Sequence, residues 1–399
     1  MISLNKNIRE IIKMKNHACL FFVLLISANS LFSATADTGV SKNNLGSEFS
    51  SIEQIKHKIE TGETFSKLSP FGLRVFNSFL DGKWIGNAIS YGAYRNGQQP
   101  GKIGPNEDEV FEDLSIISKH WNLIRVYSAD NISELILQVI KKHKFRTKVM
   151  LGLWLENEVN NSSINLANMQ QVLRGIELAN KFPELVSAVC VGNETQVFWS
   201  GHRMSSESLV RYIRIVRENI TQPVTTADDY NFWNKPESKI VADEIDFIVA
   251  HYYPLWNGKS IDQSIEDINK VFFNEVKKLY PDKLVVFGET GWATNYNAAK
   301  TGPGEQGTLV RGEVSVNAQE KFLILIHDWI EKNKVITFLF EVFDEPWKGG
   351  GVNSPANEIE KHWGVFYENR SPKESFLNYL KYLSSNEVNS NLIPDGVRK

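Results

Sequence analysis

Cysteine is scarce in this chain of 399 residues, which contains only Cys19 and Cys190. Two cysteines form at most one disulfide, so a small disulfide-stabilised scaffold is excluded. If an N-terminal segment that contains Cys19 is removed, Cys190 is the only cysteine left and no internal disulfide can form. The hydrophobic core alone must then stabilise the fold, which a chain of this length can achieve.

Concentrated positive charge and metal-binding spacings are also absent. Lys and Arg number 44 against 47 acidic residues, with no basic stretch beyond the N-terminus. Nucleic acid is therefore not an expected partner, because phosphate binding needs clustered cations. The eight histidines show neither HxH nor HExxH spacing, so the sequence predicts no metal site and no cofactor.

Long hydrophobic runs are limited to one near the N-terminus. Four basic residues precede the apolar run Ala18–Phe32, and Ala34-Thr35-Ala36 follows it. This order is typical of a signal peptide over residues 1–36, and the run is short for a membrane span. We expect an exported protein (periplasmic, cell-surface or extracellular) with no stable membrane span after cleavage; a retained N-terminal anchor is the alternative.

The remaining chain alternates short apolar runs with amphipathic stretches, eight times over. The predicted strands are Ile85–Tyr91, Leu123–Tyr127, Lys148–Trp154, Ser187–Gly192, Pro223–Thr226, Phe247–Tyr252, Leu284–Phe287 and Val335–Phe340. The predicted helices begin near Glu107, Ser133, Ile164, Ser205, Glu237, Ile261, Ser315 and Pro372. Apolar strands separated by helices indicate a parallel sheet covered on both faces.

Eight such units over about 300 residues favour the α/β class and a single (β/α)8 TIM barrel. An open doubly wound sheet is the alternative, but the first strand lacks the Gly-rich phosphate turn of that fold. We predict a catalytic domain over residues 82–384, a helical lead-in over residues 37–81 and a polar tail over residues 385–399.

Glutamates follow two strands of the predicted barrel, where catalytic groups of this fold lie. Glu194 follows the fourth strand and Glu289 follows the seventh, and each has a glycine close by in the sequence. Two carboxyl groups about 5 Å apart are what a retaining glycosidase requires. The alternative for each is a solvated or ion-paired carboxylate.

Aromatic residues follow the same strands. The chain has ten tryptophans, and six lie just after predicted strands, with three tyrosines in the same layer: Trp154, Trp199, Trp233, Trp256, Trp292, Trp347, Tyr230, Tyr252 and Tyr253. We expect them to stack on sugar rings, although tryptophan also fills cores. Trp84, Trp121 and Trp329 are assigned to the core.

Other charged residues of the predicted strands carry weaker hypotheses. Arg125 lies within the second strand, where a buried charge needs a partner; it orients one of the glutamates or forms a purely structural pair. His251 ends the sixth strand. Asp228 and Asp229 are an alternative carboxylate site, but adjacent side chains of a strand point apart.

The motifs Gly192-Asn193-Glu194 and Gly288-Glu289-Thr290-Gly291-Trp292 resemble glycoside hydrolase family 17, which comprises β-1,3-glucanases, β-1,3-1,4-glucanases and β-1,3-glucan transglycosylases. The likeness runs from Trp84 to Phe366 and includes Phe343-Asp344-Glu345 with Lys348. It implies Glu289 as nucleophile and Glu194 as acid/base. It further implies that Tyr91, Asn193, Glu345, Lys348 and Glu360 surround the catalytic pair and contact the substrate. From the aromatic and charged residues above, we add Tyr230, Tyr252 and Trp292 as substrate contacts and Arg125 as a supporting residue.

The resemblance implies a retaining endo-hydrolase of β-1,3-glucan polysaccharide or oligosaccharide. A β-1,3-glucan glucanosyltransferase using the same residues, and a catalytically silent sugar-binding barrel, are the alternatives. The sequence departs from compact plant members in the loop Asn295–Gly312 and in a Gly-Gly-Gly insertion within Lys348–Glu358. Because one glycosylation motif, Asn193-Glu194-Thr195, falls on the site itself, we treat such motifs as incidental and expect a bacterial-type enzyme. We also expect this enzyme to be a monomer.

Overall fold

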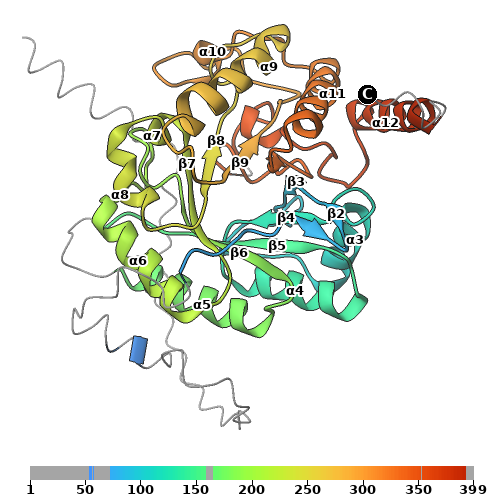
Figure 1. Cartoon of the computed structure of the whole chain (residues 1–399). Helices are drawn as coiled ribbons and strands as arrows, with labels where there is room; N and C mark the ends of the chain where they lie inside the picture. Colours follow the sequence, from blue (N-terminus) through green and yellow to red (C-terminus); the bar gives the residue numbers. More distant parts are fainter. Residues whose placement is uncertain (1–53, 56, 58–71, 159–164, 352, 392–399) are drawn as a thin grey trace, which may run out of the picture.

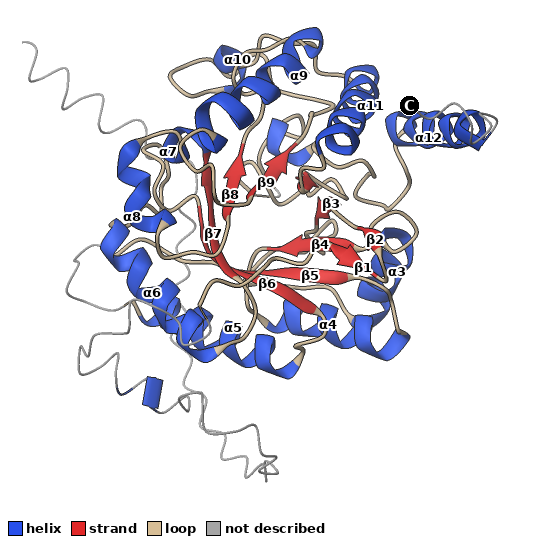
Figure 2. Cartoon of the chain, in the orientation of Figure 1, coloured by secondary structure: helices blue, strands red, loops and turns tan. Residues whose placement is uncertain are grey.

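Eight parallel strands close into a barrel in the computed structural model, which describes residues 54, 55, 57, 72–158, 165–351 and 353–391. The strand order around the barrel is β10-β3-β4-β5-β6-β7-β8-β9, and Figure 2 shows the labelled strands β3 to β9 around it. The strands are β3 (Asn87–Ser90), β4 (Leu123–Val126), β5 (Lys148–Leu153), β6 (Val186–Asn193), β7 (Val224–Asp229), β8 (Ile248–His251), β9 (Val285–Thr290) and β10 (Thr337–Leu339). The predicted (β/α)8 barrel is confirmed, and each strand overlaps the apolar run that predicted it.

Helices surround the strands on the outside of the barrel (Figure 1). They are α3 (Glu107–Ile117), α4 (Asn131–His143), α5 (Leu166–Lys181), α6 (Ser206–Asn219), α7 (Tyr230–Trp233), α8 (Lys239–Ala242), α9 (Ile261–Asn269), α10 (Gln306–Leu309), α11 (Val316–Asn333) and α12 (Glu374–Asn391), with the short helices η1 (Pro236–Ser238), η2 (Lys270–Lys277) and η3 (Ile359–Lys361). Side-chain caps explain several starts: Asp130, Ser205 and Ser315 each accept a hydrogen bond from the first turn. Such caps satisfy amides that have no partner within the helix.

Three features differ from the expectations. A hairpin of β1 (Phe79–Leu80) and β2 (Lys83–Trp84) precedes the barrel, α10 lies within the loop predicted over Asn295–Gly312, and α12 extends past residue 384 into the predicted tail. The predicted signal peptide and most of the predicted lead-in lie outside the described residues. Within the described ranges, no helix is both long and apolar enough to cross a bilayer.

The barrel separates two apolar layers. Inside it, small and large residues including Ala88, Met150, Ala188 and Phe338 are buried, and Phe76 stacks on Phe247 with ring centroids 4.7 Å apart. The larger layer lies between the strands and the helices. This arrangement fixes the strand ends on a rigid frame, which is what a catalytic site requires.

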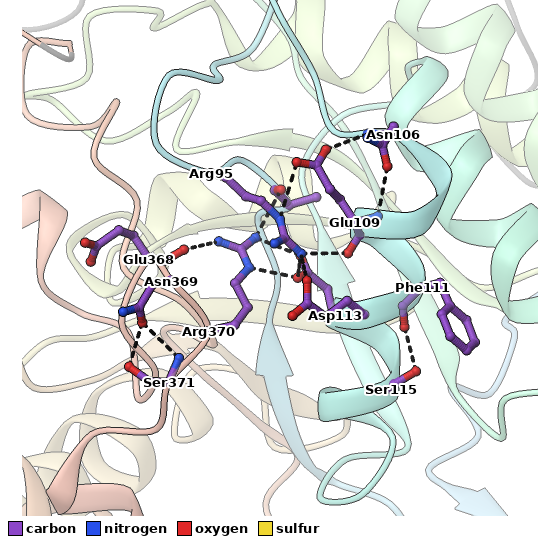
Figure 3. Close-up of polar contacts among 12 residues, drawn as sticks. Arg95, Asn106, Glu109, Phe111, Asp113, Ser115, Glu368, Asn369, Arg370 and Ser371 are labelled. Atoms are coloured by element: carbon purple, nitrogen blue, oxygen red, sulfur yellow. Dashed lines mark hydrogen bonds and ion pairs between the residues drawn. The ribbon is translucent and has the colours of Figure 1, made fainter.

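A buried charge cluster ties α3 to the segment before α12 (Figure 3). Asp113 of α3 accepts hydrogen bonds from Arg95 Nη2 and from Arg370 Nε and Nη2, all at 2.8 Å. The hydroxyl of Tyr91 donates to the same carboxylate at 2.9 Å. The segment before α12 is thereby fastened to α3.

Strand register brings polar residues to one rim of the barrel. Asp229 of β7 pairs with His251 of β8, which in turn pairs with Glu289 of β9. Parallel strands present their carboxyl ends at the same face, so these side chains meet there. Gly192 (φ +83°) and Glu194 (φ +52°) adopt left-handed backbone conformations that change the direction of the chain at the end of β6.

Candidate active site

The two predicted catalytic glutamates lie on either side of His251. Its Nδ1 is 2.9 Å from Glu194 Oε1, and its Nε2 is 3.5 Å from Glu289 Oε1. An oxygen of Glu194 lies within 4.8 Å of an oxygen of Glu289. This spacing matches the roughly 5 Å of retaining glycosidases and is shorter than the roughly 6.5–9.5 Å of inverting ones.

Arg125 is buried beneath this pair. Its Nη1 lies 2.9 Å from Glu289 Oε1 and donates to the Gly288 carbonyl, also at 2.9 Å. Its Nη2 donates to Asn193 Oδ1 at 2.6 Å. Because Arg125 takes the amide oxygen, the Asn193 amide nitrogen remains the group that can donate to a ligand.

Glu289 is held in its ionised form. Burial opposes ionisation, but the Arg125 guanidinium and a hydrogen bond from the Tyr253 hydroxyl (2.8 Å) favour the charged form, to which His251 adds only when it is protonated, and the pKa of Glu289 is lowered. A hydrogen bond donated to a carboxylate favours its charged form. An ionised carboxylate is what a nucleophile needs.

Glu194 has the opposite environment. Burial, the neighbouring charge of Glu289 and that of Asp229 raise the pKa of Glu194 well above its usual value. Two close carboxyl groups resist double ionisation, so one keeps its proton. Glu194 is therefore suited to donate a proton at neutral pH.

His251 is a neutral imidazole whose proton position can be assigned. Burial lowers the pKa of His251 to about 4. Nε2 lies 2.9 Å from Arg125 Nη1, and a guanidinium only donates, so Nε2 must accept. The single ring proton then sits on Nδ1 and is donated to Glu194 Oε1, which leaves Oε2 as the oxygen that carries the acid proton.

A second charged cluster follows β10. Lys348 Nζ lies 2.7 Å from Glu341 Oε2 and 2.7 Å from Glu345 Oε2. Burial raises the pKa of Glu360 to about 7, with Lys348 opposing and Glu289 reinforcing the shift. The predicted residues Glu345, Lys348 and Glu360 thus share one electrostatic environment with the catalytic pair.

Glu341 belongs to this cluster but was not predicted. It is 1% exposed, and burial raises its pKa well above the usual value. The sequence signal was available, since a glutamate directly after an apolar strand of a barrel faces the catalytic rim. His251 was noted at the end of its predicted strand without a role, and Tyr253 was expected to stack on a sugar ring, whereas its hydroxyl donates to Glu289.

Several predicted substrate contacts are buried instead. Tyr91 is 2% exposed and bonds to Asp113, while Tyr252 is 1% exposed and its hydroxyl bonds to Asp267. Trp292 is 1% exposed and donates from Nε1 to the Glu313 carbonyl at 2.9 Å. The structure places all three in the core. Tyr230 is half-buried and packs edge-on against Tyr252.

The other rim tryptophans divide by exposure. Trp233 is fully buried and donates to the Val249 carbonyl, so it fills the core. Trp154, Trp256 and Trp347 are half-buried, and Trp199 is 52% exposed. Trp347 Nε1 donates to Glu345 Oε1 at 2.9 Å. These four remain able to contact a ligand.

The alternative carboxylate pair has structural partners. Asp228 accepts hydrogen bonds from the amides of Gln196 (2.8 Å) and Val197 (3.1 Å), which fastens the loop after Glu194. Asp229 caps α7 through the Asn231 amide at 2.8 Å. The two side chains have separate partners and do not face one common point, in agreement with the alternation of side chains along a strand.

Among the described residues, Glu194, His251 and Glu289 are close enough together to be considered as metal ligands. The guanidinium of Arg125 already contacts Glu289 Oε1 and His251 Nε2 and places a positive charge between them. A cation there would face repulsion and lose two of its three donor atoms. The arrangement suits proton transfer better than metal binding.

Comparison with known proteins bears on this geometry. The sequence model of the BtgE/BtgC glycoside hydrolase domain matches residues 88–364, which contain every barrel strand except the first residue of β3. The chain belongs to this family. It is accordingly a glycoside hydrolase, and Glu194 and Glu289 lie within the matched region.

Similar proteins include fungal enzymes. The glycosidase is 27% identical over 282 residues to the glucan 1,3-beta-glucosidase of Arthroderma benhamiae, covering 66% of this chain and 82% of that protein. It is 25% identical over 283 residues to the glucan 1,3-beta-glucosidase of Schizosaccharomyces pombe, covering 67% and 79%. With the glucan endo-1,3-beta-glucosidase btgC of Emericella nidulans the identity is 23%, over 68% of this chain and 42% of that protein.

Solved structures share the fold. An endo-laminarinase from Formosa superposes with a TM-score of 0.63 at 22% identity, covering 75% of this chain and 88% of that one. A glycoside hydrolase family 17 beta-1,3-glucanosyltransferase from Rhizomucor miehei gives a TM-score of 0.55 at 22% identity, covering 72% and 95%. At this identity the likeness concerns the barrel itself.

Proposed function

We propose that the enzyme is a retaining glycosidase of the family 17 type that cleaves β-1,3-glucosidic bonds within glucans. The observation that carries the proposal is the close pair Glu194 and Glu289 with pKa values displaced in opposite directions. The β-1,3 linkage is supported by the names of the relatives in Arthroderma, Schizosaccharomyces and Emericella.

Two displacements complete the reaction. Glu289 attacks the anomeric carbon while Glu194 donates its proton to the departing glycosidic oxygen, which breaks the glycosidic bond and forms a glycosyl ester. Glu194, now ionised, removes a proton from the incoming acceptor, whose oxygen replaces Glu289 at the anomeric carbon. In this proposal Asn193 holds the 2-hydroxyl of the sugar at the cleavage point, supported by its amide nitrogen being left to donate.

The acceptor decides the net reaction. Water gives hydrolysis, whereas a second glucan chain gives transglycosylation with the same residues. We favour endo-acting hydrolysis, and the glucanosyltransferase reaction is the second candidate. A silent sugar-binding role does not explain why Glu194 and Glu289 are held in complementary protonation states.

Product analysis tests this proposal. Residues 37–399 acting on linear β-1,3-glucan should release a ladder of short oligosaccharides, and Glu289→Ala should abolish release while substrate binding persists. Products longer than a defined oligosaccharide substrate would identify the transferase instead. Absence of turnover by the wild-type protein, or full activity of Glu289→Ala, would contradict the assignment.

The cellular setting rests on sequence patterns alone. We propose export as a bacterial-type, monomeric enzyme, supported by the basic residues, the run Ala18–Phe32 and the small residues that end at Ala36. Mass spectrometry of the mature protein should then find Asp37 as the first residue. Light scattering of the purified enzyme should give the mass of one chain.

A further inference from the structure

The loop that follows Glu194, residues 195–205, presents two aromatic rings to solvent. The side chains of Phe198 and Trp199 lie at its tip and are 68% and 52% exposed. Large aromatic side chains are normally buried, so two adjacent exposed ones call for a partner. They lie four and five residues beyond the acid/base glutamate.

This aromatic loop is held rigidly at its base. Asp228 binds the amides of Gln196 and Val197, and the Met204 amide donates to the Thr195 carbonyl at 2.9 Å. His202 Nε2 donates to the Asn193 carbonyl at 2.6 Å. The exposed rings therefore sit on a fastened base that is joined directly to catalytic residues.

A cavity of about 200 Å³ adjoins the aromatic loop. Phe198 lines it together with the polar residues Gln196, Arg203, Ser206, Asn231, Lys235 and Glu237. The Lys235 ammonium lies 5.8 Å from the centre of the Phe198 ring. An apolar ring that shares a cavity with polar side chains suits a sugar, whose carbon face is apolar and whose edge carries hydroxyls.

The position of the loop determines which part of the glucan it would contact. Because Glu194 donates to the glycosidic oxygen of the leaving group, we infer that the loop which continues from Glu194 borders the leaving-group side of the site. We propose that the aromatic loop is a distal subsite for the leaving-group and acceptor end of the glucan, in which glucosyl units stack on Phe198 and Trp199. This inference rests on the proposed function and adds to it the part of the substrate that these residues bind.

Chain-length dependence tests the subsite. The variants Phe198→Ala, Trp199→Ala and their combination would be compared on 4-nitrophenyl β-laminaribioside, which ends close to the cleavage point, and on long laminari-oligosaccharides. Phe79→Ala is the matched control, since Phe79 is 54% exposed on β1, at the amino end of the barrel. All three side chains are exposed, so the variants should fold normally.

Loss of each ring should lower kcat/KM on long oligosaccharides by about three- to tenfold, the effect of one aromatic contact. Activity on the short aryl substrate should be unchanged, the share of transfer products should fall, and Phe79→Ala should match the wild type. Equal losses on both substrates, or no loss on the long one, would overturn the subsite while leaving the glycosidase assignment intact. Failure of the wild-type protein to act on either substrate would overturn the proposed function, and the subsite with it.

Discussion

At the scale of single residues, the site shows how surroundings give one side chain two roles. Glu194 and Glu289 are chemically identical, yet of the two only Glu289 is in contact with Arg125 and Tyr253. Glu194 instead accepts a hydrogen bond from Nδ1–H of a neutral His251. The difference in charge between the two carboxyl groups therefore comes from their surroundings: Arg125 of β4, Tyr253 just after β8, and the charge that Glu289 places beside Glu194.

The pH dependence of activity should follow from this difference. Glu289 must be ionised, so kcat/KM rises with pH through its lowered pKa, and Glu194 must be protonated, so kcat/KM falls with pH through its raised pKa. A bell-shaped profile is expected on laminarin. On a dinitrophenyl β-glycoside, whose leaving group needs no acid, the alkaline limb should disappear. An unchanged alkaline limb on that substrate would contradict the role of Glu194.

His251 should act on Glu194 as a positioning residue. The groups that face its ring are Arg125, Glu194, Asp229 and Glu289. In His251→Phe the carboxylate of Glu194 loses a donor, so its pKa rises further and the alkaline limb should move to higher pH. Activity on oligosaccharides should fall by about 10²-fold, with a smaller loss on the dinitrophenyl substrate.

His251→Gln is the matched control for this prediction, because its amide can still donate to Glu194. We expect the activity of His251→Gln, and the pH of its alkaline limb, to lie between those of His251→Phe and the wild type. Steady-state kinetics across pH would decide the matter. A purely structural His251 would instead lower activity equally on both substrates and leave the limb where it is.

At the scale of elements, the sequence predicted the strands well because parallel strands buried on both faces are apolar throughout. It predicted the strand-end glutamates because the barrel fixes where strand ends lie. It could not separate Trp292, which is buried, from Trp199, which is exposed, since both follow strands. That distinction depends on loop paths, and Glu313, which binds Trp292, lies 21 residues away in the chain.

The charge cluster of α3 offers a stability test at this scale (Figure 3). Asp113→Ala leaves Arg370, which is 5% exposed, without its charge partner, and loss of one member of a buried pair costs about 3–5 kcal/mol. Urea denaturation should show that decrease in the free energy of unfolding. Glu112→Ala on the same helix removes a 2.8 Å ion pair with Arg95 whose glutamate is 56% exposed, so its cost should be below about 1 kcal/mol. Similar costs for both would show that burial of Asp113 adds nothing.

At the scale of the whole molecule, the catalytic rim gathers carboxyl groups that the folded protein holds against their tendency to ionise. Burial raises the pKa of Glu194 and of Glu341 well above the usual value and that of Glu360 to about 7. Glu194, Glu341 and Glu360 therefore release their protons more readily in the unfolded chain than in the folded protein. Glu289, whose pKa is lowered in the fold, does the opposite. The site therefore lowers the stability of the fold at neutral pH, as functional sites often do.

The contribution of these three glutamates to stability should fall as pH rises from about 5 to 8, whereas His251, whose pKa is lowered to about 4, contributes in the opposite direction below about pH 6.5. A folded-state pKa above the unfolded value of about 4.3 for glutamate means that the native state binds more protons in between, and the free energy of unfolding then decreases with pH. For Glu360 the loss is complete once pH exceeds about 7. Because glutamine does not ionise, the drop in Tm between pH 5 and pH 8 should be smaller in Glu360→Gln than in the wild type by calorimetry. Glu266→Gln, at an exposed position of α9, should keep the wild-type slope; identical slopes for all three proteins would mean that Glu360 ionises normally in the fold.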